Sequence, residues 1–207
     1  MKKTIFICLL LTANVFAQDA NSNKTIKSSN LETITLGGGC YWCVEAVYEN
    51  LMGVKSVVSG YAGGKGSNPT YEQVSTGNTG YAEAVQITYD KTVTNPDEIF
   101  RVFFTVHDPT TLNRQGADAG TQYRSVIFYK NAAQKSEAQS IINALTKAKA
   151  YNKPIVTTIE PLTKFYKAED YHQNYYANNK SQQYCQMVIQ PKIEKFEKVF
   201  KDRLKKR

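Results

Sequence analysis

Polar and apolar residues alternate in several short stretches of the chain, and this pattern predicts β-strands. In residues 82–90, Val85, Ile87 and Tyr89 take every second position, as expected for a strand that buries one face. Other short runs rich in β-branched and aromatic residues predict strands at residues 32–36, 54–64, 123–129 and 154–161.

Elsewhere the apolar residues recur at three- and four-residue spacing, which predicts amphipathic helices. After Cys40, the residues Val44, Val47 and Leu51 follow this spacing as far as residue 52. An Asn-Pro start signal and the same periodicity predict further helices over residues 95–108, 132–150 and 191–207.

The predicted elements follow the order strand–helix–strand–strand–helix–strand. This order is typical of the split βαβ arrangement of ferredoxin-like folds, in which helices cover one face of a sheet. We therefore expect one α+β domain over residues 31–190, followed by a basic amphipathic C-terminal helix over residues 191–207. Two long loops, over residues 65–80 and 109–122, interrupt the domain, and loops of this length tend to be functional.

The N-terminus has the pattern of a secretory signal peptide over residues 1–17. A pair of lysines precedes an apolar run, and Ala17 offers a small residue for cleavage. The apolar run is shorter than a membrane-spanning helix needs. Polar residues 18–30 then predict a flexible leader. We expect an exported protein, periplasmic or secreted, without an integral membrane span.

The chain is basic, with a formal net charge of +8 over 207 residues. The positive excess is concentrated in residues 192–207, where Ile193, Phe196 and Leu204 recur at helical spacing between lysines and arginines. This pattern favours a docked helix with a solvated basic side over a nucleic-acid-binding patch. We expect a monomer that does not bind nucleic acid.

The cysteines suggest redox chemistry. Removal of a signal peptide containing Cys8 would leave Cys40, Cys43 and Cys185, and an odd number of thiols cannot all pair within one chain. Cys40 follows three glycines at the predicted start of a helix, where unpaired backbone N–H groups stabilise a thiolate and lower its pKa.

Three interpretations of the Cys40-x-x-Cys43 pair remain open from the residues alone. The pair fits thiol–disulfide exchange, ordinary packing, or half of a zinc site completed by His107 and His172. The histidines are equally compatible with structural hydrogen bonding, and the tyrosines of "YHQNYY" with packing or the rim of a substrate site.

Five segments, taken together and in order, resemble the A type of peptide methionine sulfoxide reductase. They are "GGGCYWCVEAVY", "SGYAGG", "NPTYEQVSTGNTGYAEAVQITYD", "HDPTTLNRQGADAGTQYRSVIFY" and "FYKAEDYHQNYY", and they cover most of residues 34–190. The resemblance implies reduction of methionine-S-sulfoxide, free or in proteins, and thus repair of oxidative damage.

The resemblance also implies roles for single residues. Cys40 matches the nucleophile that attacks the sulfoxide sulfur and becomes a sulfenic acid. Glu83 matches the acid that protonates the sulfoxide oxygen, although the strand pattern alone also allows an outward, solvated charge there. The remaining matches are Tyr41 and Trp42 in the wall that receives the methyl group, Tyr71 and Tyr123 as phenols that hydrogen-bond the oxygen, and Asp118 in the adjoining loop.

Neither a metal nor an organic cofactor is implied, and an external thioredoxin-like dithiol is the expected reductant. The chain departs from the family's common pattern at Cys43, where many relatives have glycine, and at Tyr81, where many have histidine. Cys185 matches a recycling cysteine, on a segment expected to be mobile. We therefore expect Cys43 to resolve Cys40 before Cys185 resolves Cys43, with direct attack by Cys185 as the alternative. A general thiol–disulfide oxidoreductase using the Cys40–Cys43 pair, and a metal-binding module, are the competing functions.

Overall fold

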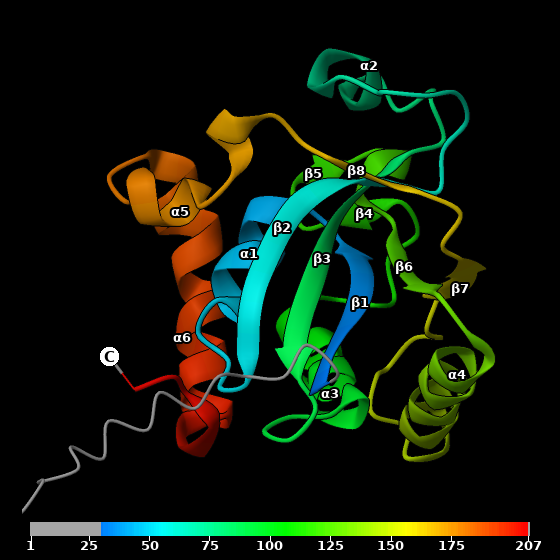
Figure 1. The fold of residues 1–207 in the computed structure, drawn as a ribbon, viewed down its shortest axis with the longest axis vertical. Coiled ribbons are helices and arrows are strands. Elements are labelled where there is room, and N and C mark those ends of the chain that lie inside the picture. Colours follow the sequence, from blue (N-terminus) through cyan, green and yellow to red (C-terminus); the bar gives the residue numbers. More distant parts are fainter. Residues whose placement is uncertain (1–29, 207) are drawn as a thin grey trace, which may run out of the picture.

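The computed structural model describes residues 30–206, which are built around a six-stranded sheet (Figure 1). Its strands are β1 (Leu31–Gly38), β2 (Val54–Ala62), β3 (Ala82–Asp90), β6 (Ser125–Tyr129), β7 (Thr158–Pro161) and β8 (Phe165–Lys167). They lie in the order β7-β6-β1-β3-β2-β8; β6 and β7 are parallel, and the other neighbours are antiparallel. The predicted signal peptide and almost all of the predicted leader lie outside the described residues.

Helices and a small ribbon complete the fold. The helices are α1 (Tyr41–Tyr48), α2 (Tyr71–Ser75), α3 (Pro96–Val106), α4 (Ala132–Lys147), α5 (Tyr175–Asn178) and α6 (Gln190–Val199). β4 (Arg114–Gln115) and β5 (Asp118–Ala119) form a separate two-stranded ribbon. α1 packs against the sheet, while α3 contacts both α4 and α6. The chain therefore has the predicted α+β class, with a curled sheet (Figure 1).

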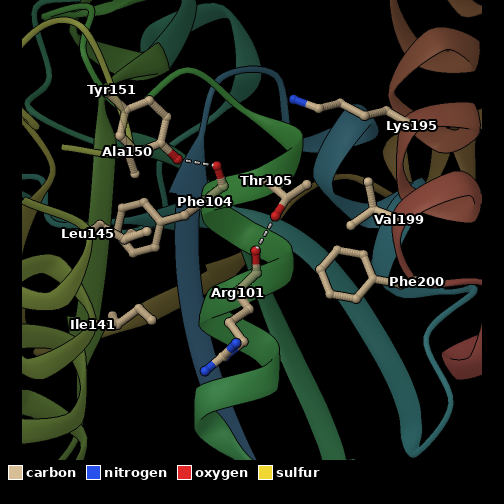
Figure 2. A pocket seen from close by; sticks show the side chains of 10 residues that line it. All are labelled: Arg101, Phe104, Thr105, Ile141, Leu145, Ala150, Tyr151, Lys195, Val199 and Phe200. Carbon is tan, nitrogen blue, oxygen red and sulfur yellow. Dashed lines mark hydrogen bonds between the residues drawn. The ribbon is translucent and has the colours of Figure 1, made fainter. Parts of the chain in front are cut away.

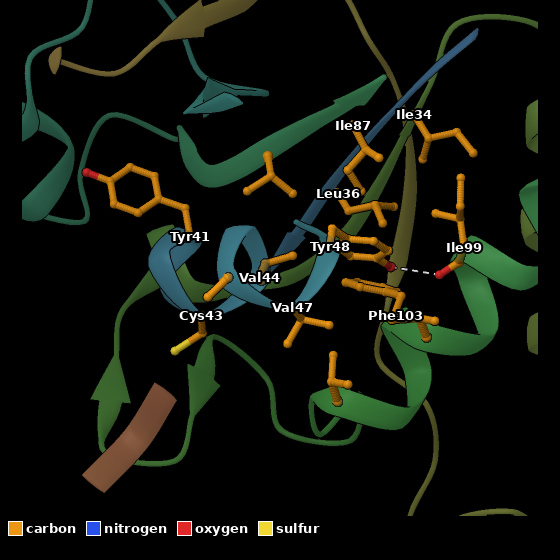
Figure 3. Close-up of a cluster of buried hydrophobic side chains, with 14 of the residues drawn as sticks. Ile34, Leu36, Tyr41, Cys43, Val44, Val47, Tyr48, Ile87, Ile99 and Phe103 are labelled. Carbon is orange, nitrogen blue, oxygen red and sulfur yellow. Dashed lines mark hydrogen bonds between the residues drawn. The ribbon is translucent and has the colours of Figure 1, made fainter. Parts of the chain in front are cut away.

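Alternation along β3 separates the two faces of the sheet. Ala82 and Ala84 belong to a small cluster on one face, whereas Val85 and Ile87 belong to the main core beneath the helices. Glu83 shares the face of Val85, so its side chain points toward the helical layer. Figure 3 shows this layer, in which the hydroxyl of Tyr48 on α1 donates to the carbonyl of Ile99 on α3 over 2.7 Å.

Two predicted elements have different bounds. The strand expected over residues 154–161 covers only Thr158–Pro161, because the preceding segment pairs with a loop: the N–H of Val156 donates to the carbonyl of Pro109 over 2.8 Å. Within the loop expected over residues 65–80, α2 forms with a capping box between Thr70 and Gln73. That signal is visible in the sequence "TYEQ".

The C-terminal helix expected over residues 191–207 begins earlier and ends sooner. A π-helical turn at Cys185–Ile189 leads directly into α6, which ends at Val199. Arg203 then forms an ion pair with Glu98 of α3, and this contact holds the tail against the domain. Cys185, which was expected on a mobile segment, lies within this helical region and is 0% exposed.

The helical side also carries a surface groove. Figure 2 shows its lining, with Phe104 from α3, Ile141 and Leu145 from α4, and Val199 and Phe200 from the end of α6. Its volume is about 470 Å³. Among the described residues, no helix is both long enough and apolar enough to cross a membrane.

Candidate active site

The turn between β1 and α1 presents Cys40. Gly39 has a φ of +90°, and a Cβ there would lie 2.6 Å from the side chain of Gln115, so glycine is required for both reasons. Cys40 is the N-cap residue of α1, with φ −56° and ψ 126°, and only 6% of it is exposed. The predicted placement at the helix start is therefore correct.

Glu83 lies beside the start of α1. One of its carboxylate oxygens, Oε2, accepts the backbone N–H of Tyr41 over 3.0 Å, and 3% of the residue is exposed. The alternative of an outward, solvated charge is therefore wrong. Burial raises the pKa of Glu83 to about 8, and the charge of Asp118 adds to this shift. At neutral pH the carboxyl is mostly protonated, so it has a proton to donate.

The two thiols near the helix start form a pair. A hydrogen bond joins Cys40 and Cys43. Burial raises the pKa of Cys40 well above its ordinary value, while the hydrogen bond from Cys40 lowers the pKa of Cys43 to about 7. The expectation that the helix start lowers the pKa of Cys40 is therefore wrong for this resting arrangement, because desolvation outweighs the favourable backbone N–H groups. Lys192 of α6 also stabilises the thiolate of Cys43.

Two phenols complete the polar side of the site. The hydroxyl of Tyr123 interacts electrostatically with Cys40 and Glu83, and also with Tyr71 and Asp118. These residues, distant in the sequence, are therefore brought to one place. Burial raises the pKa of both tyrosines, so each phenol keeps its proton and can donate a hydrogen bond. The backbone N–H of Tyr71 is held by Glu169 over 2.9 Å.

Tyr184 was missed by the sequence interpretation. Its hydroxyl donates to Oδ2 of Asp118 over 2.7 Å and lies 3.9 Å from the Sγ atom of Cys43. Tyr184 thus links the ribbon that carries Asp118 to the thiol pair. Its only signal in the sequence is its position directly before Cys185.

Aromatic side chains surround Trp42. Its Nε1–H donates to Nδ1 of His172 over 3.2 Å, and the ring of Tyr175 stacks on the indole with centroids 3.6 Å apart and an angle of 5° between the planes. Tyr41 is 1% exposed, and its hydroxyl lies 3.4 Å from that of Tyr61. From the segment "YHQNYY", Tyr175 and His172 therefore contact the indole of Trp42.

The histidines do not join the cysteine pair as zinc ligands. Nδ1 of His107 lies 2.6 Å from the carbonyl of Phe103, and Nε2 lies 2.8 Å from the hydroxyl of Ser125. Burial lowers the pKa of His107 to about 4, so it is a neutral structural residue. Within residues 30–206, no group of three His, Cys, Asp or Glu side chains is arranged to hold a metal ion.

Tyr81, at the second departure from the family pattern, is also structural. It is 3% exposed, and its hydroxyl donates to the carbonyl of Gly66 over 3.0 Å. This contact ties the strand end to the loop before α2. The position therefore supports the loop that carries Tyr71.

Cys43 is the thiol that interacts with both of the others. It shares a hydrogen bond with Cys40, and its charge raises the pKa of Cys185, whose thiol burial also disfavours ionisation. Cys43 is therefore electrostatically coupled to both of the other thiols.

The neutral Glu83 distinguishes this site from a simple disulfide-exchange centre. Exchange between thiols and disulfides expels a sulfur leaving group and needs no acid of this kind. An oxygen leaving group needs a proton, which a buried carboxyl with a raised pKa supplies near neutral pH. The fold and site therefore define a thiol-dependent reductase of an oxygen-bearing substrate.

Comparison with known proteins gives the particular family. Residues 32–204 match the family model described as peptide methionine sulfoxide reductase. The chain is 55% identical over 174 residues to peptide methionine sulfoxide reductase MsrA 1 of Rhodopirellula baltica. The aligned residues cover 84% of this chain and 90% of that protein.

Solved structures agree with this match. The reduced form of Mxr1 from Saccharomyces cerevisiae superposes with a TM-score of 0.69 and 36% identity, covering 78% of this chain and 94% of that one. A structure of Mxr1 in complex with Trx2 superposes with a TM-score of 0.50 and 28% identity, covering 73% and 91%. The chain belongs to the peptide methionine sulfoxide reductase family and is an oxidoreductase that reduces methionine sulfoxide in protein repair.

Proposed function

We propose that the chain reduces the S epimer of methionine sulfoxide, with Cys40 as nucleophile and Glu83 as general acid. The observation that carries this proposal is the buried Glu83, hydrogen-bonded to the N–H next to Cys40 and with a pKa raised to about 8. The sulfur of Cys40 attacks the sulfoxide sulfur while Glu83 protonates the oxygen. The protonated oxygen leaves the substrate sulfur as hydroxide and attacks Sγ of Cys40, which breaks the new sulfur–sulfur bond. Methionine leaves with the electron pair of that bond, Cys40 becomes a sulfenic acid, and the proton that Cys40 lost replaces the one that Glu83 gave.

The other site residues bind the substrate in this proposal. The phenols of Tyr71 and Tyr123 donate to the sulfoxide oxygen as negative charge develops on it. Trp42 and Tyr41 contact the methyl group, and burial of such a small apolar group contributes about 1 kcal/mol. Asp118 holds Tyr184 over the thiols and keeps the pKa of Glu83 high.

Cys43 resolves the sulfenic acid first. It attacks Cys40, water leaves, and a Cys40–Cys43 disulfide forms; Cys185 then attacks Cys43 and regenerates the Cys40 thiol. The hydrogen bond between Cys40 and Cys43 supports the first step. The burial of Cys185 means that the π-helical turn has to open before the second step.

A thioredoxin-like dithiol completes the cycle by reducing the Cys43–Cys185 disulfide. The complex of Mxr1 with Trx2, a structural relative at 28% identity, supports this choice of partner. Reductant access also requires movement of the C-terminal region, because Cys185 is buried in the resting arrangement.

A single turnover without reductant tests the proposal. Reduced protein is mixed with separate S- and R-sulfoxide peptides, and products are followed by intact mass and disulfide mapping. We expect methionine from the S peptide alone and a Cys40–Cys43 disulfide. In Cys43→Ser, a Cys40 sulfenic acid should accumulate and be trapped by dimedone. If that variant forms a Cys40–Cys185 disulfide as fast as wild type forms its Cys40 disulfide, the proposed order of Cys43 before Cys185 is wrong.

The four strands β6-β1-β3-β2 form a ferredoxin-like core in our proposal, with β7 and β8 added at the edges. Their order and antiparallel pairing support it.

We also propose export through residues 1–17, supported by the lysines, apolar run and Ala17 in the sequence. N-terminal sequencing of the full chain expressed in a two-membrane bacterium should find Gln18 as the first residue in the periplasmic fraction. An uncleaved cytosolic product would contradict this.

A further inference from the structure

Glu45 is a buried carboxylate that the proposed chemistry does not use. It lies on α1 with 1% of the residue exposed. Its Oε1 accepts the backbone N–H of Asn174 over 3.1 Å, and its Oε2 accepts the N–H of Tyr175 over 3.3 Å. Both oxygens therefore hold two consecutive backbone groups of a segment about 130 residues away in the sequence.

The held segment carries the ring that covers Trp42. Trp42 and Glu45 are three residues apart on α1, so their side chains lie on one helix face. Tyr175 contacts both: its backbone meets Glu45 and its ring stacks on the indole at 3.6 Å. In Figure 1, α5 lies next to α1, at the end of the chain segment that follows β8.

The backbone at this junction is left-handed at one residue. Asn174 has a φ of +52°, in the left-handed region, which asparagine tolerates better than most residues. The N–H groups of Asn174 and Tyr175 stand at the start of the four-residue helix α5, where they have no partner within the helix. Glu45 supplies acceptors for both groups.

The groups around Glu45 shift the pKa of its carboxyl in opposite directions. Burial raises its pKa to about 7, and the charge of Glu49 on α1 adds to this. The N–H groups of Asn174 and Tyr175, and the hydroxyl of Ser59 on β2, act in the opposite direction. The ionised form accepts both N–H groups best, so these two hydrogen bonds are strongest above pH 7, although burial of the charge lowers the stability of the whole fold there.

We propose that Glu45 is a positioning residue of the substrate site, which holds the backbone at Asn174 and Tyr175 so that Tyr175 stays stacked on Trp42. The wall that meets the substrate methyl group is then two fixed, stacked rings before substrate arrives. The proposal rests on the proposed function in that Trp42 contacts substrate. A preformed wall lowers the ordering cost of binding, so its loss acts on KM more than on kcat.

The single tryptophan of the chain gives a readout that needs no substrate. In Glu45→Ala, we expect acrylamide to quench Trp42 fluorescence at least twofold more efficiently than in wild type, because Tyr175 leaves the indole. Glu45→Gln keeps one acceptor oxygen and should fall between the two. Glu137→Gln, at an exposed glutamate on α4, is the matched control and should behave as wild type.

Kinetics then connect the wall to binding. For an S-sulfoxide peptide, Glu45→Gln should raise KM about fivefold to tenfold with kcat within about threefold of wild type. Tyr175→Leu should raise KM similarly while leaving the buried carboxylate in place. The double variant should be no worse than the poorer single variant, because both changes remove the same wall.

The outcomes separate this proposal from the proposed function. Wild-type quenching in both Glu45 variants, or additive KM effects in the double variant, would overturn the positioning role. A changed quenching with unchanged KM would overturn it as well. Failure of the wild-type protein to reduce either sulfoxide would remove the proposed function and leave the quenching result standing. If Glu45→Ala does not fold, the quenching and KM values of Glu45→Gln and Tyr175→Leu still test the positioning role of Glu45.

Discussion

Glu83 on β3 and Glu45 on α1 are both buried carboxyls that accept backbone N–H groups. Glu83 accepts one such bond, from Tyr41, and its pKa is raised to about 8. Glu45 accepts two, from Asn174 and Tyr175, and its pKa is raised only to about 7. Burial is the largest cause in both cases.

The difference shows how the same residue type serves two purposes. With one donor and the negative charge of Asp118 nearby, Glu83 keeps its proton at neutral pH and can give it to a leaving oxygen. With two donors, Glu45 is ionised in a large fraction of molecules and holds the backbone of α5. One carboxyl works when protonated and the other when ionised, so activity should be highest between pH 7 and 8.

The largest expected effect comes from removing the proton donor. Glu83→Gln preserves the shape of the side chain but cannot transfer a proton, so the single-turnover rate should fall about 10²- to 10⁴-fold. Rapid-quench measurement of methionine formation from an S-sulfoxide peptide gives this rate. Glu137→Gln is the exposed control, and a Glu83→Gln rate within threefold of wild type would refute the acid role.

Both carboxyls should also make the fold less stable at alkaline pH. Their folded pKa values lie above the unfolded value of 4.5, so the stabilisation is fully present below pH 4.5. It is lost as pH rises through about 7 for Glu45 and about 8 for Glu83, by on the order of a few kcal/mol each. Urea unfolding from pH 5 to 9 measures this loss.

The glutamine variants separate the two contributions. The free energy of unfolding of Glu83→Gln should decline less than that of wild type, with the difference between them developing up to about pH 8. For Glu45→Gln the difference should be complete near pH 7. Parallel pH curves for wild type and Glu83→Gln would show that this carboxyl is ionised in the folded protein.

Smaller shifts should follow from neutralising one neighbour of each carboxyl. Asp118→Asn removes a charge that raises the pKa of Glu83, so the alkaline fall of kcat should move to lower pH by about one unit or less. Glu49→Gln should move the acidic rise of KM to lower pH by a smaller amount, because Glu49 is partly exposed and screened. Full pH profiles of both variants make the measurement.

Each of these variants is the control for the other. Asp118→Asn should leave the pH at which KM rises unchanged, and Glu49→Gln should leave the pH at which kcat falls unchanged. If the pH of the kcat fall and the pH of the KM rise both shift in either variant, the two carboxyls titrate as one coupled system.

The smallest expected effect is that of metal removal. Both carboxyls accept backbone N–H groups, and His107 is engaged by Phe103 and Ser125. Dialysis against a chelator should therefore leave the single-turnover rate unchanged within about 20%, a change of less than 0.2 kcal/mol in the barrier. A larger loss that zinc restores would favour a metal site instead.

The local elements were predictable because short-range patterns determine them. Alternation through residues 82–90 predicted β3, while the structure decided that Glu83 lies on the buried face of Val85 and Ile87. The Asn95-Pro96 signal predicted the start of α3, whose first turn is capped by the Asn95 side chain over 2.9 Å. The end of α6 was missed, because the backbone leaves the helical conformation at Phe200 although the apolar spacing continues to Leu204.

The site was predictable only as far as the family resemblance reached. Motifs named Cys40, Glu83 and Tyr123, and the structure brings them together. Tyr184 and the stacking of Tyr175 on Trp42 carried no short-range signal, since each joins segments far apart in the chain. The contacts of Glu45 were hidden for the same reason.

By itself, the sequence determined the α+β class, the glycine-led start of α1 and the identity of the chemical groups, because these depend on neighbouring residues and on motifs. Only the tertiary structure decided the protonation of those groups. The helix start favours a thiolate at Cys40, yet burial raises its pKa. Burial also raises the pKa of Glu83 and of Glu45, and the number of backbone N–H donors and the neighbouring charges then separate the two values. Solvent exclusion is a property of the folded surroundings, so no pattern along the chain reveals it.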